Sequence, residues 1–380
     1  MLTSTFLKDH KWSGNMKEIF MSDIPAKMKA VVNHGPHDYR FEMVDTPVPG
    51  PNEVLIKVSA CGICAGDIKC EAGAAMFWGE NPWVKVPVIP GHEFFGNVVA
   101  MGPGAEQHFG VKMGDRILAE QILPCNKCRF CKSGQYWMCQ PHDMYGYQSK
   151  IADGGMAEYM LFHPNSRIHH LPDSLSLEDC AAVEPMACSM HTAERADIQF
   201  EDVVVIAGAG TLGLGIVQAA KLKTPKLLIV LDTIDERLEL AKKFGADLVI
   251  NPMKEDAIKK VLDLTNGYGC DVYIEATGSP VGATQGLEMT RKLGRFVEMS
   301  VFGKEVTADW SIIGDRKELD IRGAHLGPYV YETVINLMER GLMTSKGIVT
   351  NKFDLEHWRE GFDAAHSGKE IKVLLVPDLK

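Results

Sequence analysis

Four cysteines stand close together in the first half of the chain. Cys125, Cys128, Cys131 and Cys139 follow the pattern C-x2-C-x2-C-x7-C, which can bring four thiolates around one tetrahedral zinc ion. A ferredoxin-type iron–sulfur cluster would need its fourth cysteine four residues after the third and a proline next, whereas Cys139 comes eight residues later and precedes Gln140. Disulfide bonds are the less favoured alternative. Four thiolates leave no ligand position open, so we expect a structural zinc site.

A second, scattered set of residues could bind a metal in an open site. Cys64, His92, Glu93 and Glu184 offer one thiolate, one imidazole and two carboxylates. Such a set leaves a position for water or a substrate oxygen, which Lewis-acid catalysis requires. Three protein ligands suffice for an open site, so we expect Glu93 and Glu184 to exchange roles. Taken singly, His92 also fits a hydrogen-bonded, partly buried histidine, and Cys64 fits a small core residue.

A glycine-rich segment, Gly208-Ala209-Gly210-Thr211-Leu212-Gly213, could bind a dinucleotide. It lies between an apolar run and a helical pattern, the context that the G-x-G-x-x-G motif requires. The glycines allow a tight turn, close approach to a pyrophosphate and close packing, while free N–H groups of the helix hold the phosphates. Asp232 ends the next apolar run, where it can accept both ribose hydroxyls and would repel a 2′-phosphate, so NAD is favoured over NADP. A turn needed only for packing is the alternative.

Four further residues are expected around the same dinucleotide. Thr277, Gly278 and Val301 follow apolar runs and would lie at the carboxyl ends of sheet strands, where ligands of such folds bind. Arg237 is assigned to the cofactor-binding set as well. For the loop positions, the alternative is a solvent-exposed residue without a role.

The elements that would position these residues are of two kinds. From residue 28 to about 185, short β-rich runs alternate with turn signals, as in a compact β-rich domain. From about residue 188 to 325, the chain predicts a doubly wound α/β fold with a parallel sheet. The predicted strands there are 203–207, 227–231, 248–250, 272–274 and 296–299, and the predicted helices are 212–220, 235–244, 255–264 and 281–292. Beyond residue 327 we expect a helix at 331–340 and a strand at 371–376 that returns to the first domain.

The composition is that of a folded chain with about two domains. With 380 residues, 46% of them hydrophobic and 24% charged, a disordered or fibrous protein is excluded. The net charge of −10 argues against a nucleic-acid or acidic-membrane partner. Glycines interrupt the longest uncharged stretch, 203–220, so it is not expected to span a membrane. The ten cysteines are used locally and residues 1–27 lack a signal-peptide pattern, so we expect a cytoplasmic protein.

Together these motifs resemble the zinc-dependent medium-chain dehydrogenase family. The resemblance runs from residue 28 onward and is carried by Gly62-Ile63-Cys64 with Asp67, Gly91-His92-Glu93, the four cysteines, Glu184-Pro185, the glycine-rich segment and Asp232. It implies a GroES-like β-rich catalytic domain and a Rossmann domain. It further implies catalytic zinc in the cleft between the two, structural zinc on a lobe, NAD as cofactor, and a homodimer or homotetramer.

Within that family, Glu184-Pro185 resembles the polyol (sorbitol-type) branch, because plain alcohol dehydrogenases would place a cysteine ligand there. Residues 34–40, 77–79, 140–143 and 323–329 resemble erythritol and threitol dehydrogenases more narrowly. The implied reaction transfers a hydride from a secondary hydroxyl carbon of a small polyol to NAD and yields a ketose. The substrate pocket is expected to include Met76, Phe77, Trp78 and Trp83. The alternative is that these apolar residues form the core of a lobe.

One departure from the family affects the proton path. Relatives commonly carry a hydroxyl residue just before the aspartate, but here Gly66 precedes Asp67. Lys69 stands where many relatives carry a relay histidine, and near a bound dinucleotide its ammonium group could release a proton more readily and take that role. A solvated lysine without a role is the alternative.

These inferences divide the chain into an N-terminal extension at 1–27, a catalytic domain with its zinc lobe at 28–187, a Rossmann domain at 188–325 and a return to the catalytic domain at 326–380. Two other functions stay open. A simple alcohol or aldehyde dehydrogenase would be separated by comparing butanol with four-carbon polyols. A non-catalytic protein that binds zinc and a dinucleotide would be favoured by one zinc per chain instead of two.

The acidic residue after the second strand of the α/β region predicts the cofactor. Replacing it in Asp232→Ser removes the carboxylate that would repel a 2′-phosphate, so NAD should bind more weakly and NADP relatively better. Initial rates with each cofactor measure the change in preference. A wild-type enzyme that already prefers NADP would contradict this interpretation of Asp232.

Overall fold

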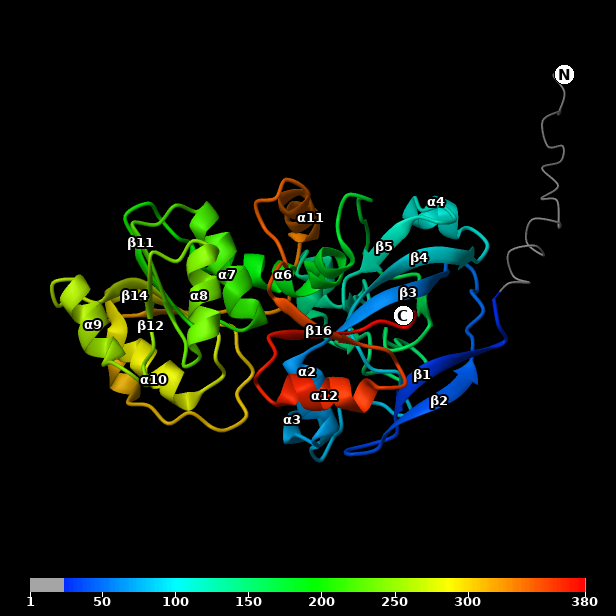
Figure 1. Ribbon diagram of the computed structural model, residues 1–380, viewed down its shortest axis with the longest axis horizontal. Coiled ribbons are helices and arrows are strands. Elements are labelled where there is room, and N and C mark those ends of the chain that lie inside the picture. Colours follow the sequence, from blue (N-terminus) through cyan, green and yellow to red (C-terminus); the bar gives the residue numbers. More distant parts are fainter. Residues whose placement is uncertain (1–23, 380) are drawn as a thin grey trace, which may run out of the picture.

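The structure is a computed structural model that describes residues 24–379, and two sheets organise this part of the chain (Figure 1). The first and last segments build a seven-stranded sheet in the order β16-β17-β3-β4-β5-β9, with β8 paired to β3. Its strands are β3 (Val54–Ile63), β4 (Glu93–Met101), β5 (Arg116–Ala119), β8 (Tyr159–Phe162), β9 (Ile168–His170), β16 (Val349–Phe353) and β17 (Lys372–Leu375). All of its pairs are antiparallel except β16 with β17.

Smaller elements surround this sheet. An antiparallel hairpin joins β1 (Lys27–Asn33) and β2 (Tyr39–Asp45), and a second short pair joins β6 (Ile122–Leu123) and β7 (Asp143–Met144). The short helices are α2 (Ala65–Glu71), α3 (Ala75–Trp78), α4 (Ala105–Phe109), α5 (Arg129–Lys132) and the 3₁₀ turn η1 (Tyr136–Met138). Apolar residues of β1, β3, β4 and β8 pack together in one buried core of this half. The prediction of a β-rich first part is therefore confirmed.

The middle of the chain forms a six-stranded sheet in which every pair is parallel, in the order β12-β11-β10-β13-β14-β15. Its strands are β10 (Val203–Ala207), β11 (Leu227–Leu231), β12 (Leu248–Ile250), β13 (Cys270–Glu275), β14 (Thr290–Glu298) and β15 (Asp320–Gly323). Its helices are α7 (Thr211–Leu222), α8 (Asp235–Lys243), α9 (Ala257–Leu264) and α10 (Pro280–Met289), and the 3₁₀ turn η2 (Trp310–Ile312) precedes β15. This order is the doubly wound arrangement, so the predicted α/β fold is confirmed.

The largest boundary error in this half is at the junction of α10 and β14, and strand β15 was not predicted. The helix expected at 281–292 ends at Met289, and Thr290 begins β14. Thr290 is fully buried, donates its hydroxyl to the Gly286 carbonyl and stands opposite Cys270 in the parallel register. The helix therefore ends where a buried β-branched residue enters the sheet, three residues before the apolar periodicity of the sequence fades.

A long helix joins the two sheets. Helix α6 (Leu177–Ala196) lies between the two halves in Figure 1, and most of its residues are buried. Val183 and Met186 belong to the same apolar core as Ala60 and Phe95 of the seven-stranded sheet and as the buried face of α7. The predicted boundary between residues 187 and 188 therefore falls inside a continuous helix that both halves share.

The last segment returns to the first sheet, as predicted. After α11 (Tyr331–Glu339) and α12 (Trp358–His366), β17 pairs antiparallel with β3, with Val373 opposite Ile63. Of the predicted N-terminal extension, residues 1–23 lie outside the described residues, and β1 begins at Lys27.

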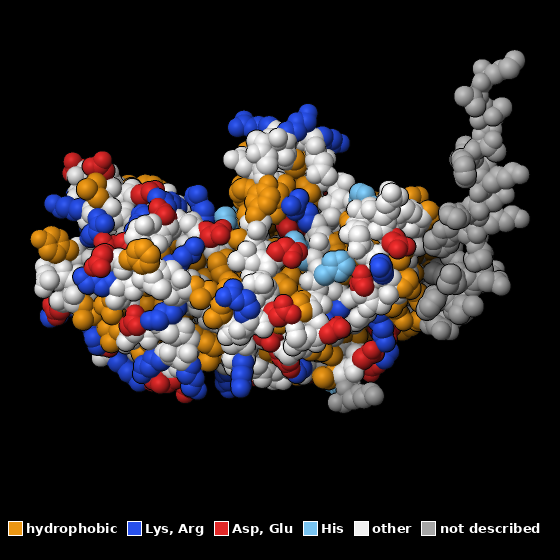
Figure 2. Space-filling view, turned by 90° about the horizontal axis from the view of Figure 1, so that it is seen from above, with side chains coloured by type: hydrophobic (Ala, Val, Ile, Leu, Met, Phe, Trp, Pro, Cys, Tyr) orange, Lys and Arg blue, Asp and Glu red, His pale blue; other side chains and the backbone are white. Residues whose placement is uncertain are grey.

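Lysine, arginine and carboxylate side chains are intermixed over both halves in Figure 2. Within residues 24–379, no helix combines the length and the apolar character needed to cross a bilayer.

Close packing of α10 on β13 predicts one stability effect. A Cβ at Gly286 would stand 2.2 Å from the ring of Tyr273, which is fully buried and stacked on Phe296. Gly286→Ala should therefore destabilise the protein by about 1–3 kcal/mol through overpacking, although alanine favours an isolated helix. Thermal unfolding measures this effect. Gly314→Ala is the matched control, because its Cβ meets nothing within 4 Å, and an equal loss in both variants would contradict the explanation.

Candidate active site

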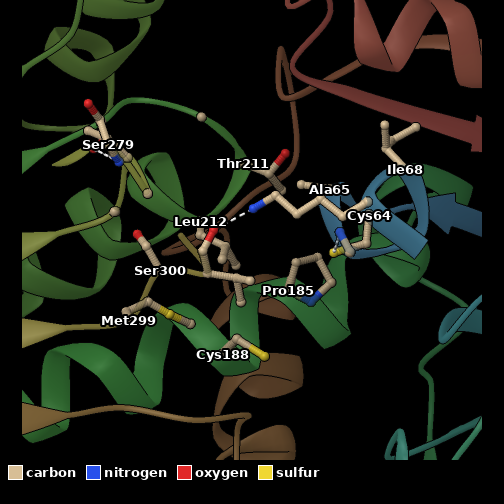
Figure 3. Close-up of a pocket in the computed structure, with 18 of the residues that line it drawn as sticks. Cys64, Ala65, Ile68, Pro185, Cys188, Thr211, Leu212, Ser279, Met299 and Ser300 are labelled. Carbon is tan, nitrogen blue, oxygen red and sulfur yellow. Dashed lines mark hydrogen bonds between the residues drawn. The ribbon is translucent and has the colours of Figure 1, made fainter. Parts of the chain in front are cut away.

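A single cleft of about 1270 Å³ lies between the two sheets and collects most of the predicted site residues. Figure 3 shows Cys64, Ala65 and Ile68 on one wall, facing Thr211, Leu212, Ser279 and Ser300, with Pro185 and Cys188 of α6 between the walls. Most predicted residues line it: Cys64, Lys69, His92, Glu93, Glu184, Gly208, Gly210, Thr211, Leu212, Asp232, Arg237, Thr277, Gly278 and Val301. Of the predicted metal, catalytic and cofactor residues other than the four lobe cysteines, two, Asp67 and Gly213, do not line the cleft and lie behind its walls.

Strand register brings three donors of the open set together. Cys64 follows β3 directly, and Gly62 at the end of β3 stands opposite Glu93 at the start of β4. The ligand atoms of Cys64, His92 and Glu93 consequently lie within 4.8 Å of one another. Cys64 is also the N-cap of α2, where the Asp67 carboxylate accepts its backbone N–H at 2.9 Å. The turn from β3 into α2 and the position of the Cys64 side chain are thus fixed by the same contacts.

Glu93 is held by a buried lysine that sequence analysis missed. Lys372 donates to both oxygens of Glu93, at 2.7 and 2.6 Å, and to the carbonyl of Ile63 at 3.0 Å. Both side chains are 5% exposed or less. Burial alone would lower the pKa of Lys372, but the neighbouring negative charges, that of Glu93 first, and the hydrogen bonds to Glu93 together outweigh burial and raise it. The signal in the sequence was a charged residue at the start of an apolar strand.

Glu184 has different, uncharged partners. It accepts from the side-chain amide of Gln121 and from the thiol of Cys188 at 3.5 Å, and Tyr331 donates to the other end of Gln121 at 2.7 Å. Burial, followed by the charge of Glu93, raises the pKa of Glu184 to about 7. Glu184 lies near the three clustered donors but is not part of that cluster. Gln121, a buried amide beside β6, is a second residue that sequence analysis missed.

His92 is oriented from behind the cleft. Its Nδ1 lies 3.5 Å from Asp67 Oδ1 and 3.4 Å from the hydroxyl of Tyr147, which itself donates to Asp67 at 3.3 Å. Burial would lower the pKa of His92, but the charge of Asp67 and the hydrogen bonds to Asp67 and Cys64 together outweigh burial and raise the pKa. With Nδ1 engaged, Nε2 is the nitrogen left for a ligand. Tyr147 is a third residue that sequence analysis missed, and it stacks on Phe77 at 5.7 Å.

The four cysteines of the lobe form a separate cluster whose sulfur atoms lie within 4.8 Å of one another. All four thiols are free of disulfide bonds. Backbone N–H groups point at the sulfurs: Cys125 N–H donates to Cys139 Sγ at 3.2 Å, and Cys128 N–H to Cys125 Sγ at 3.4 Å. N–H groups of Cys131 and Gln140 lower the pKa of Cys128 to about 6. Backbone N–H groups lower the pKa of Cys125 as well, whereas burial raises the pKa values of Cys131 and Cys139. Four sulfur donors this close together match a closed tetrahedral metal site.

The opposite wall is built from the glycine-rich turn. Gly208 has a φ of +98°, and a Cβ there would stand 2.7 Å from the Ala276 carbonyl. A Cβ at Gly213 would meet the Gly208 carbonyl at 1.9 Å, which explains why Gly213 lies behind the wall. A Cβ at Gly210 would meet nothing within 4 Å, so this position faces open space at the start of α7. Gly208 therefore serves the turn, Gly210 the approach of a ligand and Gly213 the packing.

Polar contacts fix the loops that follow the neighbouring strands. Asp232 accepts the N–H groups of Ala209 at 2.7 Å and Ile234 at 2.9 Å. Glu275, which sequence analysis missed, is fully buried and accepts from Thr277 N–H at 2.9 Å and Gly278 N–H at 3.1 Å. Both carboxylates thus hold loops at the carboxyl edge of the sheet.

Two predicted cations in the cleft are already bonded to carbonyl groups. Lys69 donates across the cleft to the Val301 carbonyl, and burial lowers the pKa of Lys69. Arg237 donates to the carbonyls of Gly368 at 2.6 Å and Glu370 at 3.0 Å.

The end of the cleft next to the lobe is mostly apolar. Met76, Phe77 and Trp83 line it, as predicted, whereas Trp78 packs outside it and donates to the Cys70 carbonyl at 2.7 Å. His142 and His325 line the same end.

Comparisons with known proteins agree with this arrangement. Residues 50–173 match the alcohol dehydrogenase GroES-like domain, and residues 211–340 match the zinc-binding dehydrogenase model. The chain is 50% identical over 360 residues to an erythritol/L-threitol dehydrogenase of Mycolicibacterium smegmatis, which covers 94% of this chain and 99% of that protein. It is 36% identical to a D-arabitol-phosphate dehydrogenase of Enterococcus avium, with 92% and 97% covered. A zinc-binding dehydrogenase from Sinorhizobium meliloti, solved with NADP bound, matches with a TM-score of 0.84 and 28% identity over 93% of this chain and 100% of that one.

The buried Glu93–Lys372 pair predicts a large loss of stability when one partner is removed. Lys372→Met leaves the Glu93 carboxylate buried without its cation and should cost about 3–5 kcal/mol in the free energy of unfolding. Denaturant unfolding of the metal-free protein measures the loss. The double variant Glu93→Gln with Lys372→Met should recover much of it, since no charge is then left unpaired. Lys27→Met, which breaks an exposed 2.8 Å pair with Asp45, is the control and should change little. A Lys372→Met protein as stable as wild type would contradict the role of the pair.

Proposed function

Because this chain belongs to the zinc-binding alcohol dehydrogenase family, we propose that it oxidises a secondary hydroxyl group of a small polyol to a ketone with NAD as hydride acceptor. The observation that carries the proposal is the cleft itself. One wall presents the clustered Cys64, His92 and Glu93, and the other presents the glycine-rich turn at the start of α7. A cofactor on the second wall would place its reactive end next to a substrate held at the first.

The donor sets fit two zinc ions of different kinds. The four lobe thiols fit a closed structural site, and Cys64 and His92 with a carboxylate fit an open catalytic one. When bound in the open site, zinc supplies Lewis acidity that lowers the pKa of the substrate hydroxyl.

Charge balance separates the roles of the two carboxylates. Lys372 already neutralises Glu93, whereas Glu184 has only an amide and a thiol as partners. A Cys64 thiolate and a Glu184 carboxylate together carry two negative charges, which match a divalent cation without help from Glu93. We therefore assign Glu184 as the carboxylate that binds the metal ion most readily. Glu93 stays paired with Lys372 and is the alternative ligand.

The cofactor assignment rests on Asp232 and its neighbours. Its carboxylate lines the cleft at the carboxyl end of β11, where it would face the ribose of a dinucleotide and repel a 2′-phosphate. Arg237, which could otherwise attract such a phosphate, is occupied by two backbone carbonyls. Gly208, Gly210, Thr211 and Leu212 would receive the pyrophosphate, with Gly213 packed behind them. Thr277, Gly278 and Val301 would flank the nicotinamide.

Proton release needs a group other than the hydroxyl residue that Gly66 replaces. Lys69 Nζ is within the cleft, and burial lowers the pKa of this amine. We assign Lys69 as the group that accepts the proton once a bound dinucleotide has replaced its contact with the Val301 carbonyl. Asp67 acts from behind by holding Cys64 and His92 in place.

The charges around the cleft favour an uncharged substrate. Among the described residues that line it, three are cationic, and each is engaged: Lys69 by Val301, Arg237 by Gly368 and Glu370, and Lys372 by Glu93. A phosphorylated polyol or an amino acid would require a free cation for its anionic group. A neutral polyol needs only hydrogen-bond partners, which supports this substrate class. A simple alcohol dehydrogenase is the second candidate, supported by the apolar Met76, Phe77 and Trp83.

We also propose a cytoplasmic homodimer or homotetramer whose domains divide at residues 187/188 and 325/326. All ten cysteines are free thiols, which suits a reducing compartment. Strand β15 is the edge of the six-stranded sheet and carries the exposed Ile321, which suits pairing with another copy.

Activity and metal content together test this function. With NAD, the wild type should oxidise erythritol or a threitol far faster than butanol and should hold two zinc ions per chain. Cys64→Ser should keep its fold and NAD binding but lose most turnover, whereas Cys131→Ser should lower the folded yield or the melting temperature. Cofactor-linked absorbance, metal analysis and thermal unfolding provide the readouts.

Each result has an opposite that contradicts a part of the proposal. A wild type that prefers butanol would favour the simple alcohol dehydrogenase. One zinc ion per chain and no turnover would favour a non-catalytic binding protein. Full activity with two metals in Cys64→Ser would remove this cysteine from the open site.

A further inference from the structure

Two histidines from opposite halves of the molecule meet at the lobe end of the cleft. His142 precedes β7 in the segment that follows the lobe, and His325 follows β15 of the six-stranded sheet. Their rings stack with centroids 5.1 Å apart and 25° between planes, and their Nε2 atoms lie 3.2 Å apart. Both line the same cleft as the open donor set.

A continuous row of rings connects this pair to the candidate metal site. His92 lies 5.6 Å from Tyr147, Tyr147 lies 4.8 Å from Trp83, and Trp83 lies 6.0 Å from His142, measured between ring centroids. The histidine pair is therefore at the far end of a row of rings that starts at His92 of the open donor set. Phe77, Met76 and Trp83 make the wall between them largely apolar.

The pair can act as both donor and acceptor. Burial, followed by the neighbouring His142 and His191, lowers the pKa of His325 to about 4, so its ring is neutral at physiological pH. When two neutral imidazoles share one hydrogen bond through Nε2, each ring still has its Nδ1. That nitrogen donates or accepts a hydrogen bond according to the tautomer. Hydroxyl groups also donate and accept, so neutral rings match them better than they match an anion.

We propose that His142 and His325 form the specificity site for polyols, by hydrogen bonding a hydroxyl group on a carbon remote from the one that is oxidised. This inference rests on the proposed function and names two residues that select polyols over alcohols with an apolar tail. Because each half contributes one ring, the site is complete only when the two halves are in the arrangement described here. The lobe contributes as well, since Trp83 donates to the His142 carbonyl at 3.2 Å and His142 follows Cys139 by three residues.

Substrates of equal length but different polarity test the pair. Threitol and butane-2,3-diol both have four carbons and two adjacent secondary hydroxyls, but only threitol has terminal hydroxyls. His325→Phe keeps a flat ring and removes the hydrogen bond. It should lower kcat/KM for threitol roughly tenfold, mainly through KM, and leave kcat/KM for butane-2,3-diol within about twofold. His142→Phe should behave alike, and the double variant should lose less than the product of the two single losses, because both rings bind one group.

Binding without turnover separates specificity from structure. Threitol binding to the enzyme–NADH complex, measured by calorimetry, should weaken by the same factor in His325→Phe, while NADH affinity and the melting temperature stay unchanged. His325→Gln, which keeps a donor and an acceptor, should retain most of the threitol affinity. Equal losses on both substrates, or no loss on either, would overturn the role of the pair while leaving the proposed function intact. A wild type inactive on both alcohols would instead contradict the proposed function itself.

Discussion

The pairing of β3 with β4 on one side and with β17 on the other determines where the donors of the open site lie. In this register Gly62 stands opposite both Glu93 and Leu374, so Cys64, Glu93 and Lys372 converge at one corner of the sheet. A Cβ at Gly62 would stand 2.1 Å from a Glu93 oxygen, so only glycine lets that carboxylate lie across the strand. A shift of one residue would turn these side chains to the other face of the sheet.

Helix α6 extends this corner into a cleft. It carries Glu184 on a face that is buried against both halves. Gln121, next to β6, donates to that carboxylate, and Tyr331 at the start of α11 holds Gln121 in turn. The same helix packs closely on α7, where a Cβ at Gly215 would stand 2.4 Å from the Ser189 hydroxyl. Because α7 begins at the glycine-rich turn, the proposed cofactor wall and the proposed metal wall are positioned by one shared element. Rigid placement of two reactants in this way is a large part of what an active site contributes to rate.

Local patterns made most of the fold predictable, and long-range contacts set the limit. The strands 203–207, 227–231 and 248–250 were predicted at their observed bounds, because buried parallel strands read as short apolar runs between turns. The end of α10 was misplaced, since burial of Thr290 in the sheet depends on a partner strand that periodicity does not reveal. The cysteine cluster, in contrast, was predictable from local spacing, because its four members lie within fifteen residues of one another.

Three of the residues that were missed share one property. Tyr147, Gln121 and Lys372 reach their partners across separations of 80, 63 and 279 residues, and none belongs to a spaced motif. Each is a polar group inside an apolar surrounding, which sequence composition presents as an anomaly without naming the partner. Physical reasoning predicts that such a group must be satisfied, but only the fold shows by what.

The separation of 279 residues between Glu93 and Lys372 also has a kinetic meaning. The whole six-stranded sheet, from β10 to β15, lies within the loop that this ion pair closes. Closing so long a loop is entropically slow, whereas the βα units inside it form from contacts between near neighbours. The local contacts in the half with the glycine-rich turn are therefore expected to form before this pair closes. The open donor corner is complete only when β17 pairs with β3, so the proposed metal site is expected to be among the last parts of a newly made chain to form.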